Sequence, residues 1–224
     1  MMSGGMNLVE TFAALSGIDG LFHGFVKRIP SVDVAVEKEE ALQALRAAHD
    51  LALEGIGTDR SRLWTAEQIH GSGIGVCEEG AVARCWPAMD GLVTAGKGEA
   101  LGIYVADCCA VFLVDPENRV CGLVHSGKRG TELEIVPKAI DLMGREFGTR
   151  PEAVVAQLSP CIRPPRYEVD FAAMIRDQCR SAGLVAENIH DPGTCTGANV
   201  GHYYSYRQEK GKTGRMLAVF GFRD

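Results

Sequence analysis

The stretch from residue 101 to residue 130 constrains the fold most strongly, because it holds two β-prone runs joined by a short turn. Residues 110–114 and 120–124 are rich in aliphatic side chains, and the segment Asp-Pro-Glu-Asn-Arg at 115–119 has strong turn chemistry. Two such runs so close in sequence form an antiparallel hairpin. We therefore predict a β-hairpin in which Ala110 lies opposite His125 at the open end.

This register brings two chemically versatile side chains together. Cys108 lies beyond Ala110 on the same face of its strand, so its diagonal backbone separation from His125 is about 7–8 Å. A slip of one residue would turn the two groups to opposite faces. His70 ends another predicted strand, and Gly71 lets the chain turn away after it. We therefore expect His70, Cys108 and His125 to share one site.

Two imidazoles and one thiolate match the ligand set of a catalytic zinc site, in which the fourth position stays open to water. Such a site activates water or polarises a substrate oxygen. Copper accepts the same ligands, so the residue types leave the metal open. Without a metal, a Cys108 thiolate beside His125 is a candidate nucleophile, and in either case we expect Asp107 to orient a histidine. The structural alternative is a buried thiol beside two histidines that make ordinary hydrogen bonds.

The remaining pattern predicts an α+β fold. Runs rich in β-branched and aliphatic residues predict further strands at 63–69, 74–77, 102–106, 153–158 and 216–222. Helical patterns occur at 37–54, 133–147 and 171–181, the last with Asp170 as its N-cap. Because several strands follow one another before a helix intervenes, we expect a mixed β-sheet with helices packed on its faces. A length of 224 residues with 46% hydrophobic content predicts a single domain over 1–224.

Charge and composition argue against several partners. The formal net charge is −6 and the basic residues are scattered, which argues against nucleic acid or a membrane surface as the main partner. No apolar run approaches the roughly 18 residues of a membrane span, and residues 1–26 lack the Lys or Arg that begins a secretory signal. We therefore expect a cytoplasmic protein whose eight cysteines remain thiols, metal ligands or nucleophiles.

Short motifs along the chain carry a resemblance to a known family. In chain order they are QIHG at 68–71, MDGLVT at 89–94, VADC at 105–108, VHSGKRG at 124–130, YEVD at 167–170, CT at 195–196, YSYR at 204–207 and TGR at 213–215. From about residue 63 to the C-terminus, the chain resembles the multicopper-oxidase-like family formerly called laccase domain proteins. That family includes purine nucleoside phosphorylases and peptidoglycan-editing members.

The resemblance implies that His70, Cys108 and His125 form a metal-binding and catalytic triad, with zinc or copper, on an α/β/α-type sandwich. It also implies phosphorolysis of adenosine, inosine, guanosine or methylthioadenosine, with adenosine deamination as a side activity. Because some relatives are named copper polyphenol oxidases and others resemble thiol hydrolases, the family leaves the reaction open.

Several positions depart from the family pattern near the expected pocket. Lys128 stands where the family has Trp, Ser159-Pro160 replaces Gly-Pro, and Arg163 replaces a second Gly. The basic residues in or beside the motifs are Lys128, Arg129, Arg163, Arg166 and Arg207. We therefore hypothesise a locally basic pocket for phosphate or an anionic substrate; the alternative is a solvated rim.

The expected partners are small molecules, namely a purine nucleoside and phosphate. We assign substrate contacts to Gln68, Lys128, Arg129, Arg163, Tyr206 and Arg207, with the Tyr206 ring stacking on a base. A metal-assisted nucleoside phosphorylase, with deamination as a possible second activity, predicts phosphate-dependent release of free base. A Cys108/His125 hydrolase acting on an amide predicts inactivation by alkylation and not by chelation. A non-catalytic or redox-only metal-binding module predicts bound metal without turnover; the oligomeric state stays open.

Overall fold

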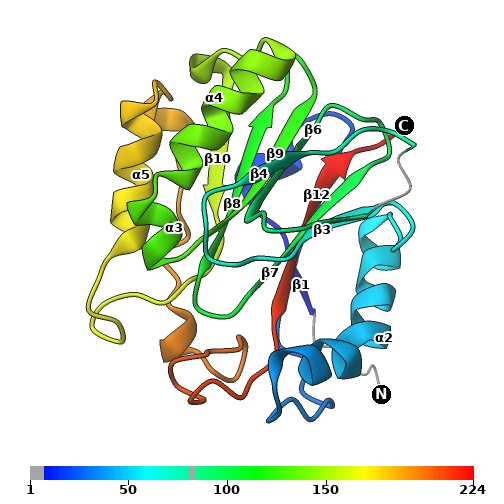
Figure 1. The fold of residues 1–224 in the computed structure, drawn as a ribbon, viewed down its shortest axis with the longest axis vertical. Helices are drawn as coiled ribbons and strands as arrows, with labels where there is room; N and C mark the ends of the chain where they lie inside the picture. The colour runs from blue at the N-terminus through cyan, green and yellow to red at the C-terminus, as the bar shows by residue number, and fades with distance from the viewer. Residues whose placement is uncertain (1–7, 81–83) are drawn as a thin grey trace.

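Two six-stranded sheets lie against each other in the computed structural model of the protein, which describes residues 8–80 and 84–224 (Figure 1). The first sheet has the order β1 (Val9–Glu10), β2 (Leu21–Val26), β12 (Met216–Phe222), β7 (Ala100–Val105), β3 (Leu63–Ala66) and β5 (Cys85–Trp86). The second has the order β11 (Ile189–His190), β10 (Val155–Leu158), β8 (Cys109–Asp115), β9 (Val120–Ser126), β6 (Gly91–Thr94) and β4 (Ile74–Val76). Both sheets mix parallel and antiparallel pairs.

Helices cover the outer faces of this pair of sheets. The helix α2 (Lys38–Ile56) packs on the first sheet, and α3 (Lys128–Glu132), α4 (Ile135–Phe147) and α5 (Phe171–Ser181) lie on the side of the second (Figure 1). A short α1 (Ala13–Ser16) precedes β2, and single 3₁₀ turns occupy Pro151–Ala153, Ala186–Asn188 and Thr196–Ala198. The α+β class and the helices on the faces are confirmed, but two sheets stand where one was expected.

The strand β8 explains how the layers are held together. Its residues alternate between two cores: Ala110, Phe112 and Val114 face the first sheet, whereas Val111 and Leu113 face the helices. Phe112 meets Phe220 of β12 edge to face, with ring centroids 5.2 Å apart. Both faces of β8 are buried, and its sequence from Cys109 to Val114 is an unbroken apolar run.

The hairpin of β8 and β9 forms in the predicted register. Ala110 pairs with His125 across the two strands. The buried Asp115 carboxylate accepts hydrogen bonds from the backbone N–H groups of Glu117 and Asn118, at 3.0 and 3.1 Å, and so fixes the turn. The open end of the hairpin therefore presents Cys108 and His125 as the sequence predicted.

The helices follow the predictions with one correction. The helix α5 has its predicted bounds, and the Asp170 side chain caps it by accepting the Ala173 N–H at 3.0 Å. The helix expected at 133–147 begins only at Ile135, because Glu134 has a φ of 57° in the left-handed region. The preceding residues form the separate short helix α3.

Residues 8–60 contribute a strand and buried side chains to the fold that the sequence patterns did not predict. The strand β2 was not predicted, yet it pairs with β12 along its whole length. His23 and His49 are buried, and burial lowers the pKa of each to about 4. An added Cβ at Gly24 would meet Ile56 and Val9 at 2.6 and 2.8 Å, so glycine lets α2 approach β2.

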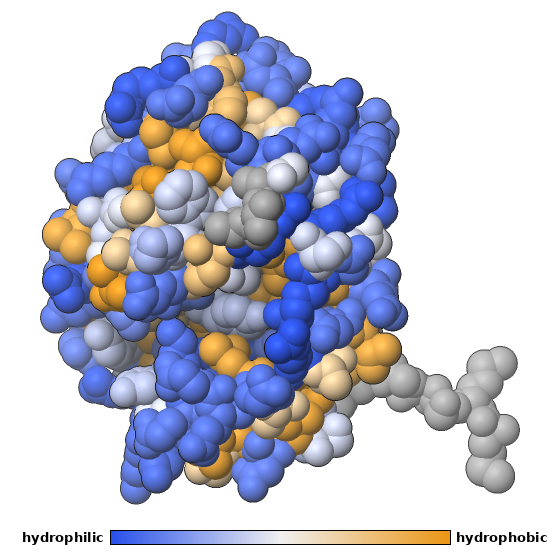
Figure 2. Space-filling view, turned by 45° about the vertical axis from the view of Figure 1, so that its right-hand side comes forward, coloured by the Kyte–Doolittle hydropathy of each residue, from blue (hydrophilic) through white to orange (hydrophobic). Residues whose placement is uncertain are grey.

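Hydrophilic residues surround smaller apolar areas on the face drawn in Figure 2. Within the described residues, none of the helices combines the length and the apolar character needed to cross a bilayer.

Candidate active site

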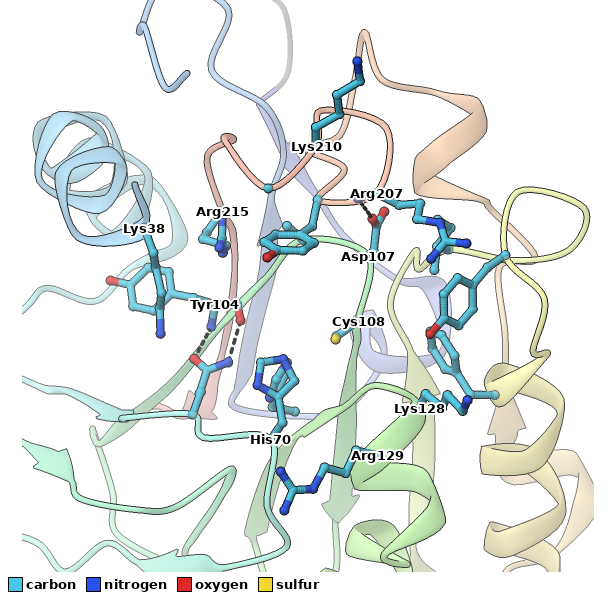
Figure 3. Close-up of a pocket in the computed structure, with 18 of the residues that line it drawn as sticks. Lys38, His70, Tyr104, Asp107, Cys108, Lys128, Arg129, Arg207, Lys210 and Arg215 are labelled. Carbon is cyan, nitrogen blue, oxygen red and sulfur yellow. Dashed lines mark hydrogen bonds between the residues drawn. The ribbon is translucent and has the colours of Figure 1, made fainter. Parts of the chain in front are cut away.

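The structure brings together the three side chains that the sequence singled out. His70 lies in the loop after β3, Cys108 immediately precedes β8, and His125 belongs to β9. One ring nitrogen of each histidine and the Cys108 sulfur all lie within 4.8 Å of one another. The two imidazole rings meet edge to face with centroids 4.9 Å apart. The side chain of Cys108 lies beside His70 (Figure 3). Three chain segments therefore converge on one sulfur.

Asp90 holds two of these segments in place. Its fully buried carboxylate accepts a hydrogen bond from His125 Nδ1 at 2.8 Å. It also accepts the backbone N–H groups of Ile69, His70 and Gly71 at 3.1, 2.9 and 2.7 Å. Since Nδ1 is engaged, Nε2 of His125 is left for Cys108 or for a metal. The sequence reasoning missed this residue, although it lies in the motif MDGLVT.

The hydrogen bonds of Asp107 serve a different purpose from the one expected. The Asp107 carboxylate accepts from the hydroxyls of Thr196 and Ser205 at 2.7 and 3.0 Å and from the Arg207 N–H at 2.7 Å. The carboxylate that orients a histidine is therefore Asp90, while Asp107 ties the loops at 196–207 to the strand end that carries Cys108.

Two further contacts fix the walls of the site. The Gln68 side chain is paired with the backbone of Tyr104, donating to the carbonyl at 2.6 Å and accepting the N–H at 2.9 Å (Figure 3). A Cβ at Gly127 would collide with Sγ of Cys108, so any larger residue there would have to displace the sulfur. Gln68 therefore anchors the His70 loop to β7, and Gly127 leaves room for the sulfur.

Electrostatics at the site favour a thiolate. Burial raises the pKa of Cys108, but the charge and hydrogen bonds of His125 and His70 outweigh it and bring that pKa down to about 6. Burial lowers the pKa of His125, yet Cys108 and Asp90 together raise it to about 9. In the absence of a metal, these two groups form a thiolate–imidazolium pair near neutral pH.

The donor set also fits a metal ion. Zinc bonds to His nitrogen and Cys sulfur measure about 2.0–2.3 Å, which places neighbouring donors about 3.5 Å apart in a tetrahedron. The three donor atoms lie within 4.8 Å of one another, so small side-chain movements would bring them to these separations. The hydrogen bond from His125 to Asp90 is the outer contact that metal-bound histidines usually make.

The three residues open into a cavity of about 880 Å³. Its lining contains the expected Gln68, Lys128, Arg129, Tyr206 and Arg207, together with the triad and Asp107. Arg163 and Arg166 are not among the described residues that line it. Arg163 instead pairs with Asp191 and donates to the Thr194 carbonyl at 3.4 Å. Three cations that sequence reasoning missed complete the basic lining: Lys38, Lys210 and Arg215.

The fold and the site define an α+β protein with a metal-capable His-Cys-His cluster in a basic cavity. The sequence matches the family described as Multi-copper polyphenol oxidoreductase laccase over residues 23–171 and 166–223. The chain therefore belongs to this family.

Relatives of this chain are found in several bacteria. It is 28% identical to a protein of Streptomyces coelicolor named purine nucleoside phosphorylase, over 89% of this chain and 94% of that one. It is 37% identical to one of the same name from Deinococcus radiodurans, over 59% of this chain and 60% of that one. The crystal structure of YlmD from Geobacillus stearothermophilus superposes with a TM-score of 0.86 at 22% identity, covering 97% and 99% of the two chains. This last likeness establishes the fold.

Proposed function

We propose that this protein is a metal-assisted purine nucleoside phosphorylase that cleaves adenosine, inosine, guanosine or methylthioadenosine with phosphate. One observation carries the proposal: the cluster of His70, Cys108 and His125 opens into a cavity lined by six basic side chains. The names of the Streptomyces and Deinococcus relatives favour the same reaction.

In this reaction the residues that line the cavity have three roles: metal binding, phosphate binding and base binding. His70, Cys108 and His125 hold the metal, zinc by preference and copper as the alternative, and Asp90 keeps His125 in its orientation. When bound, such an ion supplies Lewis-acid polarisation of a substrate oxygen. Half-buried Arg215 and Lys38 bind inorganic phosphate, and the exposed ring of Tyr206 stacks on the base.

The first test is turnover by the purified protein with adenosine, inosine and methylthioadenosine, each with and without phosphate, beside metal analysis. Cys108→Ala is the site variant, and Cys85→Ala is the matched control, since Cys85 is exposed and lies outside the cavity lining. We expect phosphate-dependent base release that disappears in Cys108→Ala and persists in Cys85→Ala. Equal activity of the two variants would remove the triad from the mechanism.

A second candidate function is a thiol hydrolase that acts on an amide. The half-buried Cys108, with a pKa lowered to about 6 beside His125, has the character of an activated nucleophile. This reaction requires no phosphate and survives chelation, but alkylation of Cys108 abolishes it. Chelator-sensitive, phosphate-dependent turnover therefore excludes the hydrolase, and the reverse pattern excludes the phosphorylase.

A further inference from the structure

The cavity carries more positive charge than one phosphate ion needs. Among the described residues, six basic side chains line it against two acidic ones, Asp107 and Glu132, although the whole chain has a net charge of −6. The basic residues are Lys38, Lys128, Arg129, Arg207, Lys210 and Arg215. Two cations are enough to neutralise a phosphate dianion, so most of this charge is surplus to a single anion.

Protein carboxylates do not account for the surplus. Of the six, Arg207 is ion-paired, with Glu168 at 3.2 Å. Across residues 8–80 and 84–224, the other five form no ion pair with a carboxylate: Arg215, for example, donates to the Thr213 carbonyl at 2.7 Å. Asp107 is buried, and its hydrogen bonds go to the loops that follow it. Unpaired cations grouped in a concave site attract anionic ligands.

These cations lie on opposite sides of the triad. In Figure 3, Lys38 and Arg215 lie on one side of His70 and Cys108, and Lys128 lies on the other. Arg215 is half-buried and lines the cavity on the same side as Lys38. Lys128 is exposed on the opposite side of the cavity from Arg215. It is therefore placed to bind a part of the substrate that is remote from the bond that breaks.

We propose that Lys128 belongs to a second anion subsite and that the enzyme prefers purine nucleoside 5′-monophosphates to the unphosphorylated nucleosides. This inference rests on the proposed phosphorylase function and names its substrate class. Inorganic phosphate occupies the side of Arg215, and the 5′-phosphate of the substrate reaches Lys128. The C1′–N9 bond breaks as a phosphate oxygen bonds to C1′, and the base leaves with a proton from dihydrogen phosphate. The products are a free purine and ribose 1,5-bisphosphate.

The test compares adenosine with adenosine 5′-monophosphate (AMP). Titration calorimetry in the absence of phosphate measures the binding of each compound, and base release in the presence of phosphate measures its turnover. We expect AMP to bind at least about tenfold tighter than adenosine, the effect of one charge-assisted contact. Lys128→Ala should reduce that ratio by about the same factor, and Lys128→Arg should restore most of it. Lys97→Ala is the matched control, because Lys97 is an exposed lysine outside the cavity lining, and it should leave the ratio unchanged.

The two readouts separate two kinds of failure. Phosphorolysis of adenosine with no preference for AMP would overturn the second subsite and leave the proposed function in place. A preference for AMP that survives Lys128→Ala would overturn the role of Lys128. Tight, Lys128-dependent AMP binding without base release would overturn the phosphorylase reaction and support the subsite.

Discussion

Replacing Asp90 by Asn tests whether this carboxylate organises the site. One Asp90 oxygen accepts His70 N–H and His125 Nδ1, and the other accepts the N–H groups of Ile69 and Gly71. An Asn side chain has one acceptor oxygen and one NH₂ group, so two of these contacts lose their acceptor in either orientation. Each buried donor left unpaired costs about 1–3 kcal/mol, which gives about 2–6 kcal/mol for Asp90→Asn.

The same substitution should weaken metal binding. Loss of an outer carboxylate–histidine contact typically lowers metal affinity about 10–100-fold. Urea unfolding of the metal-free protein measures the free energy of unfolding, and competition with a chromophoric chelator measures zinc affinity. Asp115→Asn is the matched control: Asp115 is an equally buried acceptor of two backbone N–H groups, but in the hairpin turn.

Asp90→Asn should lose both stability and zinc affinity, whereas Asp115→Asn should keep the zinc affinity of the wild type. An Asp90→Asn protein with wild-type zinc affinity would refute the role given to this carboxylate. Equal losses of zinc affinity in both variants would show that general destabilisation, and not the hydrogen bond to His125, controls the metal.

Three further predictions concern the thiol, its neighbour and the core. Alkylation of Cys108 in the metal-free protein, followed by mass spectrometry, should reach half its maximal rate near pH 6 and slow below it, because protonation removes the thiolate. His125→Asn should move that midpoint toward the ordinary thiol range; an unmoved midpoint would contradict the pairing. Gly127→Ala should displace the sulfur and lower zinc affinity about tenfold with an unchanged circular dichroism spectrum, and wild-type affinity would show that the chain relaxes around the methyl group. Phe112→Ala should cost about 3–5 kcal/mol in urea unfolding, since its buried ring joins the two sheets, and a loss below 1 kcal/mol would mean that this contact is dispensable.

The hairpin could be predicted because its determinants are local. The residues at 115–119 specify a turn on their own, and the apolar runs on either side leave few registers that bury both strands. The correct pairing of Ala110 with His125 then placed Cys108 beside His125 without any knowledge of the rest of the chain.

Asp90 could not be found in this way, because its role depends on two distant segments. It meets the loop of His70 and the strand of His125 only after β6 pairs with β9. An acidic residue before a strand has no special signature, and the nearer Asp107 was the natural candidate. The second sheet was missed for a related reason: an unbroken apolar run such as β8 does not reveal what covers each face.

The backbone conformation at the site is the feature that is hardest to predict from sequence patterns. Gln68, His70 and Asp107 all have φ values of 60–77°, in the left-handed region that usually favours glycine. Each such residue costs of the order of 1 kcal/mol or more and persists only where surrounding contacts hold it. Those contacts are present here, because Tyr104 pairs with the Gln68 side chain, Asp90 accepts the His70 N–H, and three donors hold the Asp107 carboxylate. Hydrogen bonds from distant segments therefore fix the conformations that aim His70 and Cys108 at each other, so the site forms only when the whole fold is in place.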